Sequence, residues 1–244
     1  MTKRGIICSG DEVRGILDGS VMQLRRVMKP QPEGELVSLR EWSSGLAEAC
    51  GDSHPSPDKL EDHSRSLNGK VFPFKFHGRL HSPTCPFGVP GDELWVKETF
   101  AIENSFEGNP PPHNDDRPII KWNHGEYGHG WTQPHYAATD PTPELVCLHS
   151  AHEGGPCPKP WRPAQHMPRW ASRLDLVLTA VRVQRVQEAS EKDLFDEGWA
   201  YGASQRDNFQ NMWDDKFCET AFAFKKNPWT WVLGIRKKEG DHAE

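Results

Sequence analysis

The chain has 244 residues, of which 35% are hydrophobic and 26% are charged, and its formal net charge is −6. This length suits one large domain with long insertions, and the low apolar share predicts that much of the chain is loop. The acidic balance excludes a uniformly basic nucleic-acid-binding protein. A local basic patch is still compatible with it, because binding depends on where the cations lie.

The first predicted element is a short helix over residues 11–19. Val13, Ile16 and Leu17 fall on one helical face, and Gly19 stands where a C-terminal cap is expected. After this helix the chain is predicted to be extended until it is stopped by two nearby prolines.

Two strands are predicted in the next part of the chain. The region at about 33–70 is mostly polar and shows little periodicity, so we expect an insertion there. Three phenylalanines alternate along residues 71–80, which predicts a half-buried strand. A Pro-Gly-Asp turn at 90–92 leads into a second strand, on which Leu94 and Val96 face the same way.

Residues 103–160 differ from the rest in composition, because proline, glycine and histidine are concentrated there. Such a segment is typical of an insertion, and we expect it to carry a hairpin around residues 121–131. The composition leaves open whether this insertion is a functional loop or an inert decoration.

Regular elements return in the C-terminal part. A long strand is predicted over residues 173–186, and its apolar positions change parity midway, which indicates a bulge. Ser190 and Gly198 have the residue types that begin and end a helix. A helix over 208–217 and an alternating strand over 227–238 complete the chain.

The order of these elements decides the predicted fold class. Strands are not followed regularly by helices, so a Rossmann-type sheet is not expected. We predict a single α+β domain over residues 1–244, built on a small mixed or antiparallel β-barrel with a few peripheral helices and the long insertions at 33–70 and 103–160.

The six cysteines are scattered and form no CxxC pair, which predicts free thiols in a reducing cytoplasm. No secretory or membrane-spanning segment is predicted. His77, His81 and Cys85 follow one another at intervals of four residues. Zinc would need a fourth ligand, and Pro83 lies between them, so we favour a polar loop and predict neither a metal nor a cofactor.

The motifs point to one family. The chain contains no GxGxxG, GxxxxGK[ST], HExxH or GxSxG motif, so nucleotide-loop and serine-hydrolase chemistry has no support. The segments that carry the resemblance are ILDG at 16–19, Arg25-Arg26, GDELWVKE at 91–98, HMPRWASR at 166–173 and NPWTWV at 227–232. Together they resemble the ASCH domain, a PUA-like β-barrel family, and more narrowly the longer ASCH proteins of phages and prophages. The resemblance covers about residues 11–32, 85–100 and 161–236.

The resemblance implies a PUA-like barrel with a cleft for RNA or a modified nucleobase, in a protein encoded by a phage or prophage. Some small members of the family hydrolyse N4-acetylcytidine with a lysine, a threonine and a glutamate, and another has been linked to ribonuclease activity. The family pattern GxKxxTxR places its glycine and arginine on Gly19 and Arg26. Its lysine and threonine fall on Val21 and Leu24, and its glutamate falls on Glu197. Two apolar side chains cannot activate a nucleophile, so we expect the family's amide hydrolysis to be lost.

Three residues are candidates for catalysis. Glu197 is either a site acid or a helix-end residue near solvent. Glu98 either converges with Glu197 to activate water or is an ordinary outward strand residue. His166 could act as an acid or base near neutral pH, or it could fix a loop by hydrogen bonds.

Several cations could form a local positive surface, because guanidinium groups bind phosphate and stack on bases. The arginines could instead pair with acids such as Asp175 or Glu98. Trp161 and Trp170 could offer stacking platforms, although Trp170 could also fill one end of the barrel. The predicted nucleic-acid-binding residues are Arg25, Arg26, Lys29, Arg162, Arg169, Trp170 and Arg173.

The sequence therefore favours a module that binds single-stranded RNA or DNA, or a modified nucleoside. The first alternative is a hydrolase that acts on a modified nucleoside or on RNA with an altered active site. The second is a phage structural or host-interaction protein that uses the 103–160 insertion as its contact surface.

Overall fold

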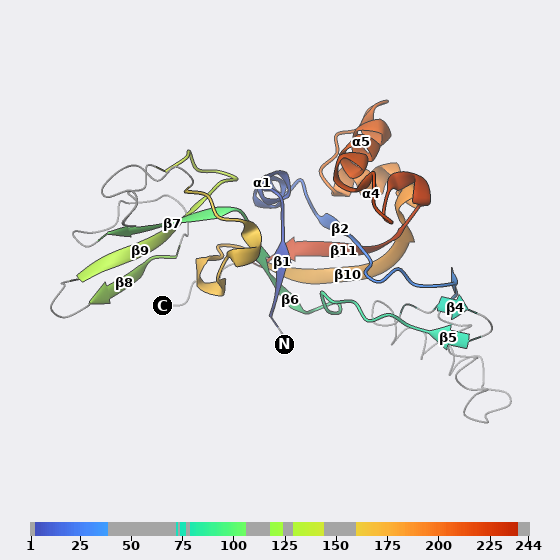
Figure 1. Ribbon diagram of the computed structural model, residues 1–244, viewed down its shortest axis with the longest axis horizontal. Coiled ribbons are helices and arrows are strands. Elements are labelled where there is room, and N and C mark those ends of the chain that lie inside the picture. Colours follow the sequence, from blue (N-terminus) through green and yellow to red (C-terminus); the bar gives the residue numbers. More distant parts are fainter. Residues whose placement is uncertain are drawn as a thin grey trace, which may run out of the picture.

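The structure is a computed structural model that describes residues 3–38, 72, 74–76, 79–105, 118–123, 129–143 and 160–238. Its centre is a five-stranded mixed sheet, in which β1 pairs in parallel with β6 and all other pairs are antiparallel (Figure 1). In spatial order the strands are β1 (Arg4–Ile7), β6 (Glu93–Lys97), β10 (Asp175–Arg185), β11 (Trp229–Lys237) and β2 (Gln23–Val27).

The predicted α+β class is confirmed, whereas the predicted closed barrel is not found. Within the described part of the chain, β1 and β2 are the two edges of the central sheet and are not paired with each other. The Arg26 side chain spans the seam between them. Its Nη2 donates to the Ile7 carbonyl at 2.8 Å, and its Nη1 donates to the Arg25 carbonyl at 2.9 Å. Both nitrogens also bind Glu12, at 2.7 and 3.1 Å.

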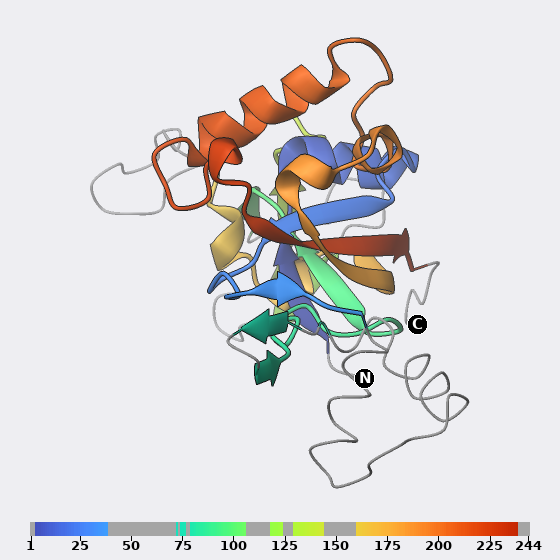
Figure 2. The ribbon, with the colours of Figure 1, turned by 90° about the vertical axis from the view of Figure 1, so that its right-hand side faces the viewer.

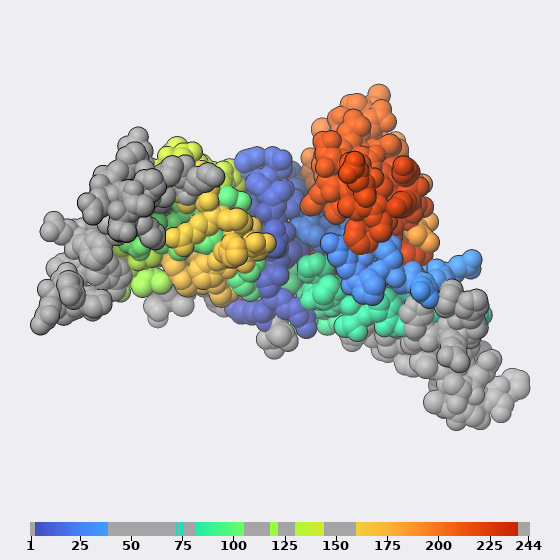
Figure 3. All heavy atoms as spheres, in the orientation of Figure 1, coloured from blue at the N-terminus to red at the C-terminus, as the bar shows by residue number. Residues whose placement is uncertain are grey.

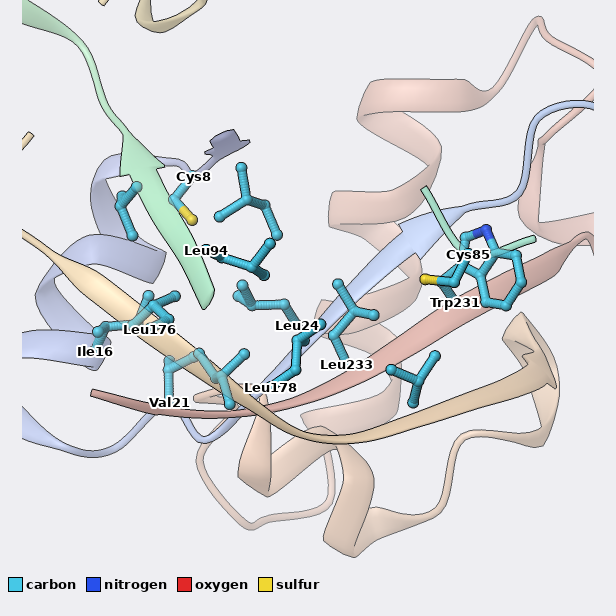
Figure 4. Packing of buried hydrophobic residues seen from close by; sticks show 14 of the residues in the cluster. Cys8, Ile16, Val21, Leu24, Cys85, Leu94, Leu176, Leu178, Trp231 and Leu233 are labelled. Atoms are coloured by element: carbon cyan, nitrogen blue, oxygen red, sulfur yellow. The ribbon is translucent and has the colours of Figure 1, made fainter. Parts of the chain in front are cut away.

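One face of the central sheet encloses the main hydrophobic core (Figure 4). Side chains that alternate along β6, β10 and β11 point into it, as the sequence pattern predicts. The pairing of β10 with β11 shifts register between Leu178 and Ala180, which confirms the predicted bulge. The buried members shown in Figure 4 include Leu94, Leu176, Leu178, Trp231 and Leu233.

Helix α1 (Gly10–Asp18) packs on this core and has the ends that its sequence predicts. Ser9 and Glu12 form a capping box at its start, which satisfies two backbone N–H groups that have no partner within the helix. Gly19 ends the helix with φ 82°, a left-handed conformation that glycine adopts without a steric penalty.

A helical lobe covers the other face of the sheet and consists of α4 (Glu191–Asp196) and α5 (Gln205–Phe217) (Figure 2). Because β11 is covered on both faces, Thr230 and Val232 are buried as fully as the apolar residues that alternate with them. Between and beside these helices lie the 3₁₀ turns η4 (Val186–Glu188) and η5 (Phe224–Lys226). The apolar centre of the lobe is Val186, Ala189, Leu194, Phe209, Trp213 and Phe224.

The second insertion contributes a separate three-stranded antiparallel sheet. It consists of β7 (Phe100–Ser105), β9 (His129–Tyr136) and β8 (Ile120–Asn123). The hairpin of β8 and β9 confirms the one predicted around residues 121–131.

The 3₁₀ turns η2 (Ala164–His166) and η3 (Arg169–Ala171) lie between this sheet and the central one (Figure 1). Met167 and Ala171 are buried against Phe100 and Tyr136, with Trp170 packed beside them. The segment 161–173 therefore joins two sheets, whereas the sequence analysis offered the end of a barrel as one place for its Trp170.

A third sheet contains β3 (Glu35–Leu36), β4 (Phe74–Phe76) and β5 (Arg79–His81). The single strand predicted over 71–80 is wrong, because the chain reverses after β4 and forms a hairpin with β5. Phe74 is buried and its ring packs edge-on against Trp229, with 5.1 Å between the ring centroids. The alternating phenylalanines thus predicted burial correctly, but they did not predict the length of the strand.

Candidate functional site

A charged pair lies between β2 and the C-terminal end of α4. Glu197 Oε1 accepts hydrogen bonds from Gln23 Nε2 at 2.9 Å and from Arg25 Nε at 3.0 Å. Arg25 Nη2 is 2.9 Å from the same oxygen. The side chains of Arg25 and Glu197 are only 2% and 8% exposed, so this is an ion pair withdrawn from solvent.

The pair is part of a closed ring of polar side chains. Arg25 Nη1 donates to Gln184 Oε1 at 3.1 Å, and Gln184 Nε2 donates to Asp193 Oδ2 at 3.5 Å. Arg182 Nη2 closes the ring by donating to Asp193 Oδ1 at 2.7 Å and to Gln23 Oε1 at 2.6 Å. We call this set the polar ring, and it consists of Gln23, Arg25, Arg182, Gln184, Asp193 and Glu197.

The fold places these residues by simple rules. Side chains two positions apart in a strand share a face, so Gln23 and Arg25 of β2 point the same way, as do Arg182 and Gln184 of β10. The backbone of Val21 forms a bridge with Glu197, which holds the end of α4 against the start of β2.

Asp193 has two roles, because it both caps α4 and belongs to the polar ring. Its backbone N–H donates to Ser190 Oγ at 3.1 Å, while its carboxylate accepts hydrogen bonds from the Ser190 N–H and hydroxyl. The capping box therefore fixes the carboxylate that receives Arg182.

Burial and charge act differently on the two carboxylates of the ring. Burial raises the pKa of Glu197 above its ordinary value, although Arg25 and Gln23 oppose this. Burial would also raise the pKa of Asp193, but hydrogen bonds from Arg182 and Ser190 bring it well below its usual range. Asp193 is therefore the carboxylate of the ring that stays ionised, whereas burial destabilises the ionised form of Glu197.

The ring reaches the surface on one side. Arg182 is the exposed member, with 46% of its side chain accessible to solvent. The molecular surface is indented between α1 and the α4–α5 lobe, and β2 lies at the base of the indentation (Figure 3).

Two polar atoms of the buried pair make no hydrogen bond. Arg25 Nη2 is fully buried, and none of its N–H groups is directed at an acceptor. Both hydrogen bonds that Glu197 receives fall on Oε1, and none to Oε2 is found among the described residues. Glu197 Oε2 is thus an acceptor that the described residues do not use, whereas Arg25 Nη2 is closed off from solvent and lies 2.9 Å from Glu197 Oε1.

The positions of the family's lysine and threonine carry apolar side chains of the main hydrophobic core (Figure 4). Leu24 lies on the face of β2 opposite Gln23 and Arg25, and Val21 precedes β2 at the backbone bridge with Glu197. Neither side chain takes part in the polar ring, so only the glutamate of the family pattern belongs to this site.

The three catalytic candidates are not brought together. Glu98 forms a buried, two-pronged ion pair with Arg173, with Nε–Oε1 and Nη2–Oε2 distances of 3.0 Å each. Arg173 precedes β10, and Gln184 lies near its other end, so on the order of 30 Å of strand separates Glu98 from Glu197. His166 is exposed on η2 and contacts Gln165 at 3.1 Å.

Glu98 is therefore not an outward strand residue, as one reading of the sequence had it, because its side chain is 2% exposed. Burial raises its pKa, and the hydrogen bonds from Arg173 oppose that rise. It does not converge with Glu197 to activate water.

The predicted cations do not form a single positive surface. Arg25 and Arg173 are buried in ion pairs, and Arg26 is bound to Glu12. Arg169 is exposed but binds Asp175 at 2.6 Å. These four are held by carboxylates, and the pairs with Asp175 and Glu98 confirm the alternative in which the arginines bind acids of the protein.

The remaining predicted residues lie apart from the polar ring. Arg162 is exposed on a backbone bridge with Phe100, and Lys29 Nζ lies 5.2 Å from the centroid of the Phe222 ring. Trp170 is half-buried between the two sheets, so it packs as an apolar residue at that junction and not at the end of a barrel. The Trp161 indole donates to Thr142 at 3.4 Å.

Sequence reasoning missed four members of the polar ring: Gln23, Arg182, Gln184 and Asp193. The missed signal is a pair of polar residues two positions apart within an apolar strand, as in Gln23 and Arg25 or in Arg182 and Gln184. Such pairs mark a strand face that packs on a polar site.

Comparison with known proteins adds no relative: the chain matches no family model, no curated protein and no solved structure. The resemblance to the ASCH family therefore remains a prediction. Of the helices in the described ranges, none is both long and apolar enough to cross a membrane. Among the same residues, no group of histidine, cysteine and acidic side chains could hold a metal ion. Cys85 is a buried free thiol, while His77 lies outside the described residues.

Proposed function

We propose that this protein binds a nucleobase at the polar ring, either as a nucleoside or within a single-stranded nucleic acid. The observation that carries the proposal is the buried Arg25–Glu197 pair, in which Glu197 Oε2 receives no hydrogen bond from the described residues. A buried ion pair is seldom more stabilising than apolar side chains of similar volume, so a cluster of this kind suggests a role beyond folding.

The resemblance to the ASCH family supports the same place, because the family's glutamate falls on Glu197. The resemblance also carries the idea that the protein is encoded by a phage or prophage. The indentation between α1 and the α4–α5 lobe offers an approach to β2 (Figure 3). Ligand sites are concave and use a few convergent polar groups to fix orientation, which matches this arrangement.

The arrangement supports recognition of the base more than of the phosphate. Four of the five arginines predicted to bind nucleic acid are held by carboxylates at Glu12, Glu98, Asp175 and Glu197, and the fifth, Arg162, is exposed. A phosphate would have to compete with these acids, whereas a neutral base would not. We therefore expect binding that depends only weakly on salt, unlike binding driven by phosphate contacts.

Hydrolysis of a modified nucleoside is the weaker candidate. Glu197 has a raised pKa, which suits a general acid. However, Val21 and Leu24 are core residues, and the polar ring contains no serine, cysteine or lysine that could act as a nucleophile. A role in host interaction has no support from the described part of the insertion.

The test is calorimetric titration of the full chain with nucleosides and with single-stranded RNA and DNA oligonucleotides, at low and high salt. We expect binding of at least one nucleoside, with a dissociation constant that changes little with salt. Glu197→Gln should weaken it by roughly tenfold or more, because hydrogen bonds to a charged group are among the strongest. Absence of binding to every nucleoside and oligonucleotide would refute the proposal.

A further inference from the structure

The face of the central sheet that points away from the main hydrophobic core is covered unevenly. The α4–α5 lobe lies over the end that holds the polar ring, and Thr230 and Val232 are buried beneath it (Figure 1). At the other end the same face is accessible, since Ile7 of β1 is 51% exposed and Trp95 of β6 is half-buried. Strand β10 runs along this face from Asp175 to the polar ring, a distance on the order of 20 Å.

The strand register places an indole in the middle of this accessible end. Trp95 lies opposite Gly5 of β1 and Asp175 of β10, and Lys97 lies opposite Ile7. Residues that lie opposite each other in neighbouring strands point to the same face. A Cβ atom on Gly5 would come within 3.0 Å of the Trp95 ring, so the indole lies against the bare backbone of β1. Because one side of the ring rests on the sheet, its other side is turned outward.

Two cations flank this indole. Lys97 Nζ lies 5.0 Å from the ring centroid, and the guanidinium carbon of Arg169 lies 5.8 Å from it. Lys97 donates to one neutral acceptor, the Gln165 carbonyl, at 2.9 Å, while Arg169 uses Nη2 on Asp175 and is 42% exposed. Each cation therefore keeps N–H groups that no described residue accepts, and these groups can turn toward a ligand on the surface.

The carboxylates of this end are outnumbered by cations. Glu93 forms ion pairs with Lys3 at 3.2 Å and with Lys238 at 2.9 Å. Asp175 forms ion pairs with Arg169 at 2.6 Å and with Lys3 at 3.8 Å. Two carboxylates are thus shared among three cations, so these acids do not neutralise the positive charge around them.

Two further cations of the same face belong to no ion pair among the described residues. Lys97 is one, and the other is the exposed Arg236, which lies on β11 opposite Val177 of β10. The whole chain has a net charge of −6, so the sign of the charge is reversed locally. An anionic partner would therefore be attracted to this end of the sheet. We call Trp95, Lys97, Arg169 and Arg236 the open platform.

We infer that a single-stranded nucleic acid binds across the open platform, with a base stacked on Trp95 and phosphates against Lys97, Arg169 and Arg236. Proteins that bind single strands combine a positively charged track with aromatic rings on which bases stack. The inference goes beyond the proposed function, because it assigns a second surface and makes the ligand a strand. The polar ring lies on the same face of the sheet, within reach of a strand of several nucleotides.

The chemistry of the open platform favours a nucleic acid over an acidic peptide. A peptide that carries carboxylates would use the cations alone, and it would leave the outward side of the Trp95 indole without a flat partner. A nucleotide offers both a planar base for the indole and a phosphate for the cations beside it. An acidic peptide is therefore the competing ligand that the experiment includes.

The test is fluorescence anisotropy of the full chain with labelled oligouridine and oligodeoxythymidine of about twelve nucleotides, at several salt concentrations. We expect the logarithm of the association constant to fall with the logarithm of the salt concentration, with a slope of about −1.4 to −2.1. Such a slope corresponds to about two or three neutralised phosphates on a single strand. A nucleoside carries no phosphate, so its binding should show no such slope.

Variants separate the charge of the open platform from its stacking surface. Lys97→Ala combined with Arg236→Ala should bring the slope closer to zero by about 1.4. The matched control is Lys225→Ala combined with Lys226→Ala, which removes the same charge from two exposed lysines beyond the other end of β11 and should leave the slope unchanged. Trp95→Leu should weaken binding roughly tenfold or more without changing the slope, and Trp95→Phe, which keeps a ring, should weaken it less.

The outcomes distinguish this inference from the proposed function. An equal change of slope in both double variants, or binding that is indifferent to Trp95→Leu, overturns the inference. So does an oligoglutamate peptide that displaces the labelled strand as well as the unlabelled strand does. If nucleosides bind and no strand binds more tightly at low salt, the open platform fails and the polar ring keeps its role. If strands bind, no nucleoside does and Glu197→Gln changes nothing, the open platform stands and the polar ring loses its role. Circular dichroism and a thermal melt establish that each variant is folded.

Discussion

Replacing Glu98 by methionine should destabilise the protein strongly, although Glu98 is far from the polar ring. The change removes the carboxylate that binds the buried Arg173 guanidinium at two nitrogens, and the Tyr136 ring, 4.0 Å away, does not replace that charge. Breaking a buried ion pair by removing one partner costs about 3–5 kcal/mol. For a chain of this size, that loss lowers the melting temperature by about 6–20 °C.

The measurement is urea denaturation with a thermal melt, on Glu98→Met, Arg173→Met and the double variant. The double variant should be more stable than either single one, because neither charge of the pair is left behind without the other. Arg169→Met is the control: its ion pair with Asp175 is shorter, at 2.6 Å, but exposed, so the loss should be below about 1 kcal/mol. A loss of similar size in Glu98→Met and Arg169→Met would refute the reasoning that burial decides the cost.

Three further predictions concern β2 and α4. Leu24→Ala should lower the free energy of unfolding by about 2–5 kcal/mol in urea denaturation, since Leu24 is fully buried in the main core; a value typical of a surface residue would contradict its placement. Ser190→Ala removes the N-cap of α4 and should cost about 0.5–2 kcal/mol by the same assay, whereas Ser204→Ala, at a helix start without a side-chain cap, should cost less. Asp193→Asn should destabilise the protein at pH 6. Ionised Asp193 stabilises the fold above its unfolded pKa of about 3.9, and this is lost as the pH falls through the depressed folded-state pKa. The stability gap between the variant and the wild type should therefore narrow in urea titrations below pH 4, and a gap that stays constant with pH would show that the charge is not responsible.

The elements that the sequence predicts correctly are those fixed by local chemistry. Helix α1 ends at Gly19, and α4 begins at Ser190, because caps depend on residues a few positions apart. The bulge of β10 is visible as a change of apolar parity within one segment. These features need no knowledge of distant parts of the chain.

The sheet topology was not predictable in the same way. The parallel pairing of β1 with β6 joins segments separated by the whole first insertion, by α1 and by β2 to β5, and no local pattern sets its register. The order of the elements and the family resemblance both led to the expectation of a β-barrel. The structure does not confirm it, because among the described strands β1 and β2 are edges that do not pair with each other.

The candidate site was predicted as separate residues with unrelated roles. Glu197 was expected to be an acid and Arg25 a phosphate contact, yet the two form one ion pair across 172 residues of sequence. A sequence pattern shows which face a side chain occupies. It does not show which charge from elsewhere will neutralise it.

The seam between the two edge strands has a consequence for solubility. A free sheet edge displays unpaired carbonyl and N–H groups, and it can recruit a strand from another molecule. The single guanidinium of Arg26 occupies one outward carbonyl on each edge, those of Ile7 and Arg25. The same side chain therefore satisfies one carbonyl on each edge strand, and neither carbonyl is left for a strand of a second copy.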